Sequence, residues 1–570
     1  MHVKKIIDKA DIYINFRKYG LKYEDNGRDA YKAKTEINYC NHAAEVFISI
    51  DAKGLPYDYQ RDISAEAGVF VDMKVAATIT GALSRAQYNP FWSRPSFERD
   101  MRSIPDNVQN ILLRTEKGYL SILPICTESY DAKIKPSDEK NTVRICVVPG
   151  QTGVKKLSGV CAVIALDNDA YKAIHNTYDY AFKKGYIKTP LRTKKKLPEV
   201  YHGLGWCTWN AFYHDVTEEK IVSKMEEFRE KNIPIKWIVI DDGWGCISDR
   251  SQFQITSIYE DSNKFPNGLK GCIDILKNKY HVESVGVWHS QTGYWQGIDP
   301  EGLLYQNQKN KFINTNFEYI IPKAQEAYDF FYTWHSYLRE QGVDFVKIDT
   351  QGNTYEFLNG MRNCVSDVIK IQEAVDESAY HNFNGNVINC MGMCNLNVNF
   401  KPYSAVMRMS DDFFPDKEDS FKEHILQNIY NSVFLSELFY CDFDMWWSKH
   451  ISAKQNMILR MISGGPIYIS DKIGESDIEN IKNLLDKSGK QLQCDSVPRI
   501  CETDLFHNPC EGILRVENTL GGEDVIALFN LSDTKKTVRN HETYRNLFSG
   551  RMVRGDITLE ANDAELYKKG

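Results

Sequence analysis

The sequence lacks long apolar runs, an excess of basic charge and a patterned set of cysteines. No window approaches the roughly 20 consecutive apolar residues of a membrane-spanning helix, and residues 1–17 mix charges into every apolar stretch, unlike a secretory signal. A formal charge of −7, from 77 acidic and 70 basic residues, leaves no basic surface for DNA or RNA. We therefore expect a cytoplasmic protein with no membrane and no nucleic-acid partner.

The 14 cysteines are scattered without the spacing of a disulfide framework. In a chain of this length, free thiols in a reducing compartment are the simpler interpretation, and we expect no disulfides. The tightest pair, Cys390 and Cys394, lacks the two-residue spacing and the second pair of a structural zinc site. We expect buried thiols there rather than a metal.

Length and apolar content indicate several packed domains. The 570 residues exceed the size at which one core stops growing, and 42% apolar with 26% charged residues suits globular cores. Over residues 1–190, short alternating apolar runs separated by Gly, Pro, Asp and Asn are typical of an antiparallel β-sandwich. Residues 188–198 are rich in bases and contain two prolines, so we expect an exposed connector and a domain boundary there.

Beyond this connector, apolar runs alternate with amphipathic helical stretches. We expect eight strands, at 202–206, 235–240, 284–288, 343–348, 386–390, 405–409, 438–441 and 466–469. Helical periodicity lies at 218–230, 322–341, 356–379, 423–438, 453–462 and 477–485. Eight such units over 200–492 predict an α/β fold of the (β/α)8 TIM-barrel type. A doubly wound open sheet is the competing fold, but no Gly-rich dinucleotide turn follows an early strand.

Two further features complete the predicted organisation. Thr217, followed by Glu218 and Glu219, is a plausible N-cap for the helix at 218–230. Strand-like stretches return over residues 495–570, which predicts a small C-terminal β domain.

Acidic and tryptophan side chains recur directly after the predicted strands. In a (β/α)8 barrel the reactive groups lie at the carboxyl ends of the strands, where the loops converge. The side chains of this kind are Trp206, Trp209, Asp241, Asp242, Trp244, Trp288, Asp349, Asp411 and Asp412. An indole suits the apolar face of a sugar ring, while carboxylates accept hydrogen bonds from its hydroxyls. The rim therefore predicts a carbohydrate ligand.

Two carboxylates from different strands can cleave a glycosidic bond, one as nucleophile and the other as acid. Lys347 points to the same side of its strand as Asp349, so we expect this cation to lower the pKa of Asp349. A buried structural ion pair is the alternative role of Lys347. Arg408 and Asp412 also share a side, which favours Asp412 as the second carboxyl; Asp411 is the alternative if the strand bulges.

Six segments, in order, resemble the raffinose synthase and seed imbibition branch of glycoside hydrolase family 36. They are GWCTWNAFY (205–213), IDDGW (240–244), VKIDTQ (346–351), RMSDDFFP (408–415), CDFDMWWSKH (441–450) and ISGGPIYISDKIG (462–474). The resemblance implies a retaining α-galactosidase or α-galactosyl transferase, with a (β/α)8 barrel between two β domains. It also implies that Asp349 is the nucleophile and that the Asp411-Asp412 pair contains the acid/base.

The resemblance also implies contacts with the sugar. Asp241 and Asp242 would hold O4 and O6 of galactose, and Lys347 and Arg408 would contact other ring hydroxyls. Trp206, Trp209, Trp244 and Trp288 would supply stacking walls. Cys390 and Gly392 would face the 2-position of the sugar, so they bear on whether the site accepts galactose or N-acetylgalactosamine.

The favoured function is a retaining, exo-acting α-galactosidase that needs no cofactor and no metal. An α-galactosyl transferase of the raffinose synthase type and an α-N-acetylgalactosaminidase remain alternatives. Asn210 stands where plant members have Asp, which bears on the sugar or acceptor site. A non-catalytic sugar-binding barrel is an alternative of a different class, but it would be expected to lose one of the two acids, and both positions are filled here. A metal-dependent hydrolase is a third alternative, but no two-His motif accompanies the acids and His289 stands alone.

Overall fold

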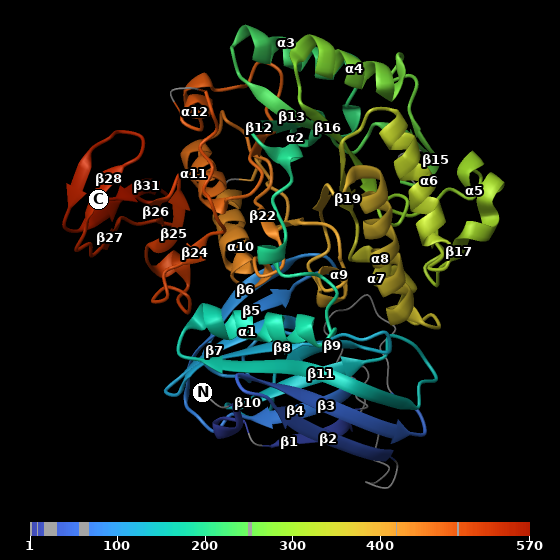
Figure 1. Cartoon of the computed structure of the whole chain (residues 1–570), viewed down its shortest axis with the longest axis vertical. Helices are drawn as coiled ribbons and strands as arrows, with labels where there is room; N and C mark the ends of the chain where they lie inside the picture. The colour runs from blue at the N-terminus through green and yellow to red at the C-terminus, as the bar shows by residue number, and fades with distance from the viewer. Residues whose placement is uncertain are drawn as a thin grey trace.

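The computed structural model describes residues 3–7, 9–15, 31–55, 68–248, 253–417, 419–486 and 489–570. Residues 1–17, assessed above for a secretory signal, lie partly outside these ranges. An N-terminal β sheet packs under a barrel of parallel strands, and a C-terminal β unit packs against the side of the barrel (Figure 1).

The N-terminal unit is the predicted β-sandwich. Its strands lie in the order β1-β4-β10-β9-β7-β8-β11-β3-β2, with β5 joined to β7 and β6 joined to β5. Apolar residues at every second position of β3, such as Val46 and Ile48, face Val69 and Val71 of β4 in one core. The bounds are β1 Ala10–Asn15, β2 Tyr31–Tyr39, β3 Ala43–Ala52, β4 Gly68–Lys74, β5 Ile79–Gln87, β6 Ser93–Glu98, β7 Val108–Thr115, β8 Gly118–Pro124, β9 Asp131–Lys135, β10 Thr142–Val148 and β11 Lys156–Asp167.

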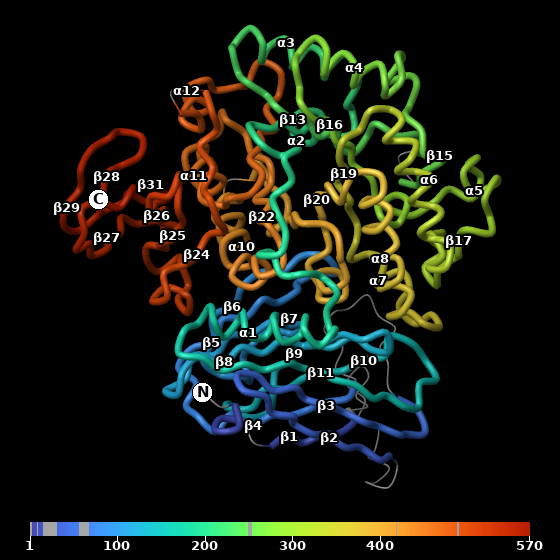
Figure 2. The backbone as a smooth tube through the Cα atoms, in the orientation of Figure 1, coloured from blue at the N-terminus to red at the C-terminus, as the bar shows by residue number. Residues whose placement is uncertain are grey.

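The segment that leads to the barrel is only partly the exposed connector that its charge predicted: Lys188, Lys194 and Lys196 are exposed, whereas other residues are buried or bind the barrel. After α1 (Ala170–Lys183), the side chains of Thr189 and Leu191 are buried. The N–H of Arg192 donates to the carbonyl of Glu437 at 2.7 Å, and Lys195 donates to a carbonyl at 3.0 Å. Burial lowers the pKa of Lys195 to about 7. The prediction of exposure therefore holds for only part of the segment, because the side chains of Arg192 and Lys195 bind barrel carbonyls, and Figure 2 traces the segment along the barrel.

All eight predicted barrel strands are confirmed, and they run parallel in the order β22-β21-β20-β19-β16-β13-β12-β23. The bounds are β12 Leu204–Cys207, β13 Ile235–Ile240, β16 Ser284–Ser290, β19 Phe345–Asp349, β20 Val387–Asn389, β21 Val406–Arg408, β22 Tyr440–Asp442 and β23 Tyr468–Ile469. β22 and β23 meet at the seam, where Tyr468 donates to Asp442 at 3.0 Å. A Cβ on Gly465 would lie 1.8 Å from the carbonyl oxygen of Cys441, so only glycine allows this approach.

Helices surround the strands, and apolar side chains fill the layer between them. In α3, Thr217 accepts a hydrogen bond from the N–H of Lys220, which confirms the predicted cap. The helices are α2 Trp209–Phe212, α3 Glu218–Glu230, α4 Gly268–Tyr280, α5 Leu303–Gln308, α6 Ala327–Glu340, α7 Asn353–Leu358, α8 Cys364–Phe383, α9 Asn395–Val398, α10 Ser420–Leu435, α11 Ala453–Ser463 and α12 Ile478–Lys482. Short hairpins lie in the loops: β14 Gly245–Ile247 with β15 Ile255–Glu260, and β17 Phe312–Asn314 with β18 Ile320–Pro322.

The C-terminal unit is the predicted small β domain. Its main sheet has the order β24-β25-β26-β31-β28-β29, and β27 pairs with β30. Gly521 and Gly522 both have positive φ and form the two-residue turn between β25 and β26. The bounds are β24 Arg499–Ile500, β25 Leu514–Leu520, β26 Glu523–Phe529, β27 Lys536–Val538, β28 Thr543–Asn546, β29 Met552–Arg554, β30 Ile557–Leu559 and β31 Ala564–Lys569.

The domain limits expected from the sequence, 1–190, 200–492 and 495–570, stay a prediction. All 14 cysteines are free thiols, Cys390 and Cys394 among them, and both of these are buried. Within the described ranges, no helix is long and apolar enough to cross a membrane.

Candidate active site

Aromatic rings fill the lower interior of the barrel and form the floor beneath the candidate residues. Trp237 of β13, Phe345 of β19 and Tyr468 of β23 pack together with ring centroids 5.1 to 5.9 Å apart. A Cβ on Gly205 or Gly286 would lie 2.3 Å from the Trp237 ring or 2.2 Å from the Phe345 ring. The two rings therefore fit only because Gly205 and Gly286 have no side chain. The polar groups of the barrel interior must lie above these rings, toward the carboxyl ends of the strands.

Above this floor, Lys347, the next inward residue of β19, forms an ion pair with Asp241, which directly follows β13. Lys347 donates to the Oδ2 of Asp241 at 2.8 Å, and the side chains are 4% and 2% exposed. Cys207 of β12 also lies 3.1 Å from the same oxygen. The alternative role of Lys347, a buried ion pair, is thus present in the structure, with Asp241 as its partner.

Asp349 lies at the end of β19 and is 6% exposed. The indole N–H of Trp288 donates to its Oδ2 at 2.9 Å, and the backbone N–H of Thr350 donates to its Oδ1 at 2.9 Å. Burial raises the pKa of Asp349 and outweighs the lowering by Lys347 and by the Trp288 hydrogen bond, while the charge of Asp412 raises it further. The predicted lowering of this pKa was wrong in net direction because burial is the larger effect.

Arg408 of β21 is fully buried and binds two carboxylates with one nitrogen. Its Nη2 lies 2.8 Å from Oδ1 of Asp412 and 2.7 Å from Oδ2 of Asp444. The side chain of Asp412 is 36% exposed, whereas that of Asp444 is fully buried. The guanidinium also lies 5.5 Å from the ring centroid of Trp92, which comes from the N-terminal sandwich. Asp412 is therefore the carboxylate of this cluster that solvent or a ligand can reach.

Asp444 is a residue of this cluster that the sequence reasoning missed. Burial raises its pKa to about 7, and the charges of Asp412 and Asp442 add to that rise while Arg408 opposes it. Its Oδ1 is buried without a hydrogen-bond partner among the described residues. The signal was present, because Asp444 lies in the CDFDMWWSKH segment, but it follows β22, which was not searched for acids.

Asp411 and Asp412 have different partners, although they are neighbours. Tyr88 of the N-terminal sandwich donates its hydroxyl to Oδ2 of Asp411 at 2.7 Å. The Oδ1 of Asp411 accepts the backbone N–H of Asp412 at 2.7 Å. Both oxygens of Asp411 are thus occupied, and it is Asp412 whose charge acts on Asp349. Their partners therefore distinguish the two acids: Tyr88 holds Asp411, and Arg408 holds Asp412.

Asp242 is enclosed by donors from the loops after β12 and β16. Tyr294 donates to its Oδ1 at 2.6 Å, and Trp295 donates to its Oδ2 at 2.9 Å. The Nε2 of His214 lies 3.1 Å from the same Oδ2. Neither His214 nor the 294–295 pair was expected from the sequence, since no motif marks them.

The four candidate tryptophans do not share one role in the structure. Trp206 is fully buried on the outer side of β12, with its ring against Phe228 of α3, so it cannot stack on a ligand. The alternation of side chains along β12 explains this, because Cys207 is the residue that points inward. Trp209 is partly exposed, while Trp244 is 3% exposed and donates to the carbonyl of Trp288.

The remaining sequence candidates are buried near the rim. Cys390 lies 3.6 Å from Nη1 of Arg408, and a Cβ on Gly392 would lie 2.6 Å from the side-chain oxygen of Gln351. Asn210 is 3% exposed. His289 bonds to His335 at 2.9 Å and does not reach the acids, which agrees with a hydrogen-bonding role. Among the residues that the structure describes, no cluster of His, Cys, Asp and Glu is arranged to hold a metal ion.

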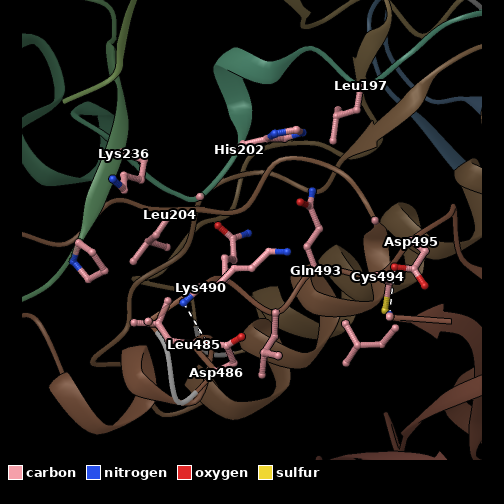
Figure 3. Close-up of a pocket in the computed structure, with 18 of the residues that line it drawn as sticks. Leu197, His202, Leu204, Lys236, Leu485, Asp486, Lys490, Gln493, Cys494 and Asp495 are labelled. Carbon is pink, nitrogen blue, oxygen red and sulfur yellow. Dashed lines mark hydrogen bonds between the residues drawn. The ribbon is translucent and has the colours of Figure 1, made fainter. Parts of the chain in front are cut away.

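A separate cavity of about 810 Å³ lies at the opposite, N-terminal end of the barrel strands. Figure 3 shows Lys236 of β13 and Lys490 and Gln493 of the α12–β24 loop around it. None of the candidate residues lines this cavity. The candidate site is therefore the group of acids at the carboxyl ends of β13, β19 and β21.

Most of the chain matches one protein family in sequence. The family model described as raffinose synthase or seed imbibition protein Sip1 matches residues 84–568. A probable galactinol–sucrose galactosyltransferase 6 of Arabidopsis thaliana is 29% identical over 487 residues, or 78% of this chain and 64% of that protein. The stachyose synthase of Pisum sativum is 24% identical over 584 residues, or 79% and 68%. The chain thus spans about two thirds of the length of these relatives.

Solved structures of low sequence identity have the same fold. The α-galactosidase of Lactobacillus brevis superposes with a TM-score of 0.60 at 11% identity, covering 99% of this chain and 85% of that one. A family 36 α-galactosidase of Geobacillus stearothermophilus gives 0.58 at 12% identity, covering 99% and 86%. The similarity supports the arrangement of a (β/α)8 barrel with β units on both sides.

Proposed function

Because the chain belongs to the raffinose synthase and seed imbibition protein Sip1 family, we propose that it cleaves terminal α-galactosyl residues with retention of configuration. Asp349 is the nucleophile, and Asp412 is the general acid and base. The observation that carries this proposal is that the charge of Asp412, at the end of β21, acts on the buried Asp349 at the end of β19. Double displacement requires two carboxyls at one anomeric centre, and the effect of Asp412 on the pKa of Asp349 supports this pairing.

In the first step, a carboxylate oxygen of Asp349 attacks the anomeric carbon, while Asp412 gives its proton to the leaving oxygen. A galactosyl ester of Asp349 forms and the glycosidic bond breaks. The Trp288 and Thr350 N–H groups hold the carboxylate of Asp349 in one orientation, and Lys347 supports its negative charge. These contacts oppose the effect of burial, which would otherwise favour the protonated acid.

In the second step, Asp412 removes a proton from water, and the resulting nucleophile attacks the anomeric carbon of the ester. The C–O bond to Asp349 breaks and the carboxylate is restored. Arg408 holds Asp412 in place by bonding to its Oδ1. The other carboxylate oxygen of Asp412 is the one that takes the proton from water. Asp412 then returns to the protonated acid of the first step.

We propose that Asp241, Asp242 and Lys347 bind the hydroxyls of galactose and that Trp209 and Trp288 bound the ring, whereas Arg408, which is fully buried, acts by holding Asp412. The Asp241–Lys347 pair offers both a charged acceptor and a charged donor within 2.8 Å of one another, which suits two neighbouring hydroxyls. The three protein donors around Asp242 fix the orientation of its carboxylate.

Galactosyl transfer to a sugar acceptor is the second candidate function. It is favoured by the curated relatives, which are named as galactinol–sucrose galactosyltransferases and a stachyose synthase. The chemistry differs only in the second step, where a sugar hydroxyl takes the place of water and Asp412 removes its proton. The substrates of both candidates are neutral galactosyl oligosaccharides.

A panel of aryl α-glycosides tests the proposal. The galactoside, N-acetylgalactosaminide and glucoside are assayed with and without sucrose, and the anomeric form of the first product is read by NMR. We expect release of α-galactose from the galactoside, and galactosyl-sucrose if transfer occurs. Preference for the N-acetylgalactosaminide, or a first product of β configuration, would refute the proposed substrate or the double displacement.

A further inference from the structure

A groove of about 530 Å³ lies where the three parts of the chain meet. The β5–β6 hairpin of the N-terminal sandwich forms one wall, α10 of the barrel forms another, and the short turn Pro509–Glu511 forms the third. Figure 1 shows β5 and β6 extending from the sandwich toward α10. The volume is within the range of about 300–1,000 Å³ typical of small-molecule sites.

Tyr88 connects the inner end of this groove to the catalytic acids. Its ring lines the groove and is 39% exposed, while its hydroxyl donates to Asp411 at 2.7 Å. Gln427 donates to the same hydroxyl at 3.3 Å and to Glu423, another residue of the groove, at 2.9 Å. A residue that lines the groove therefore bonds to the sequence neighbour of Asp412, the proposed acid and base.

The hairpin that forms the groove is held rigidly against the barrel. The side-chain oxygen of Asn89 accepts the N–H groups of Phe91 and Trp92, which fixes the turn. The carbonyl of Phe91 accepts the N–H of Met393, in the loop after β20. A Cβ on Gly352, three residues after Asp349, would lie 2.4 Å from the carbonyl oxygen of Pro90. The groove is therefore formed before any ligand binds.

Buried Arg85 adds a second attachment of the hairpin to the same loop. Its Nη2 donates to the side chain of Asn395 at 2.9 Å, its Nη1 donates to the carbonyl of Met393, and its Nε donates to Asn110 at 2.8 Å. These bonds join the sandwich to the end of β20. A ligand in the groove would thus be held at a fixed distance from the barrel acids.

The lining of the groove suits a neutral, hydroxyl-rich ligand. Arg94 and Glu423 neutralise each other through two bonds of 3.0 Å, so this pair leaves no free charge for an ionic ligand. The other charged residues of the lining are Glu98, Lys422 and Glu511, and Lys422 is paired with Asp533 at 2.6 Å. Amide and apolar side chains complete much of the lining: Gln87, Asn508, Pro95, Phe97, Pro105 and Leu426. Amide groups form hydrogen bonds with the hydroxyls of a sugar, while aromatic and proline side chains pack against its C–H surfaces. A sugar-binding site requires both kinds of group.

We propose that this groove binds the sugar residues on the far side of the scissile bond, both when they leave with the cleaved oxygen and when they return as acceptor. The ligand class is a neutral oligosaccharide. This inference rests on the proposed function, and it assigns to the N-terminal sandwich and to the Pro509–Glu511 turn a part in substrate selection.

Ser96 of β6 lines the groove and is partly exposed, so Ser96→Trp fills the groove with an indole ring. The experiment compares kcat/KM for raffinose, whose distal sugars need the groove, with kcat/KM for 4-nitrophenyl α-galactoside, which does not reach it. We expect the raffinose to aryl galactoside ratio to fall at least about tenfold, as expected from removing about 1.4 kcal/mol of binding. Thr558→Trp adds the same ring on exposed strand β30 and is the matched control, with the ratio of the wild type.

A ratio within twofold of the wild type in Ser96→Trp would overturn the inference while the proposed function stands. If Ser96→Trp does not fold, Arg94→Ala takes its place, because it removes an exposed side chain of the groove. We then expect KM for raffinose to rise about threefold or more while KM for the aryl galactoside is unchanged, and an unchanged KM for raffinose would overturn the inference. A wild-type protein that cleaves neither substrate would refute the proposed function and the inference with it.

Discussion

Replacing Trp288 with Phe tests whether Asp349 must be ionised to act as nucleophile. The substitution removes the indole N–H that donates to Oδ2 of Asp349 at 2.9 Å and keeps an aromatic ring at the position. The backbone N–H of Thr350 and the charge of Lys347 remain. The ionised carboxylate loses one of its two donors, so the pKa of Asp349, already raised by burial, must rise further.

The size of this effect follows from the strength of one hydrogen bond to a charged group. Such a bond contributes about 1.5–3 kcal/mol, and each pKa unit corresponds to about 1.4 kcal/mol. We therefore expect the pKa of Asp349 in the free enzyme to rise, and the acid limb of the pH profile to move to higher pH. Below that new pKa, kcat/KM falls about tenfold for each pH unit, because only the ionised carboxylate attacks.

The assay is kcat/KM for 4-nitrophenyl α-galactoside across the acid limb of the pH profile. Trp244→Phe is the matched control, because its indole N–H donates to a backbone carbonyl and not to Asp349, so its acid limb should keep the wild-type position. An acid limb in Trp288→Phe that stays in place, or moves to lower pH, would refute the assignment of Asp349 or the role of this hydrogen bond.

Other substitutions test the remaining assignments. Asp349→Ala should lower turnover of an aryl α-galactoside about 10⁴-fold or more, and azide should restore it by forming the β-galactosyl azide; absence of that product would place the nucleophile elsewhere. Asp412→Asn should lower kcat/KM for raffinose about 10²–10⁴-fold and affect the aryl substrate far less, and the same pattern in Asp411→Asn instead would move the role to Asp411. In the fold, the pKa of Asp444 is raised from 3.8 to about 7, so the folded state binds the extra proton between these values. Its contribution to stability is present below about pH 4 and is lost as the pH rises to about 7, by at most about 1.4 kcal/mol per pH unit. The free energy of unfolding of Asp444→Asn, measured with urea at several pH values, should lack this decrease with rising pH. A decrease equal to that of the wild type would contradict the raised pKa of Asp444.

The barrel could be predicted from the sequence because each strand is a short apolar run with a distinct end. IKWIVI before Asp241 and the run before Asp349 are buried on both sides, as parallel strands require, and this placed their acids at one end. The exact facing of a side chain was harder to predict. Trp206 was expected at the site, but it points outward because the inward position of β12 belongs to Cys207.

Other parts of the site depend on contacts that no local pattern marks. Tyr88 and Asp411 are 323 residues apart in the sequence, so their hydrogen bond could not be foreseen. The net pKa of Asp349 depends on a balance between burial and charge, and burial is a property of the whole fold. The basic segment 188–198 was assigned to the surface by its composition, and Lys194 and Lys196 are exposed, but Arg192 and Lys195 bind barrel carbonyls that are distant in sequence.

Arg85 has a consequence for how this protein can be cut or recombined. The guanidinium belongs to the sandwich, yet its partners Met393 and Asn395 belong to the barrel. A barrel expressed without the first 167 residues would keep the buried carbonyl and amide but lose the cation that satisfies them, at a cost of about 1–3 kcal/mol for each unpaired group. Chimeras between relatives should therefore exchange the β5–β6 hairpin and the loop after β20 together, because the hydrogen bonds of Arg85 require matching residues in both segments.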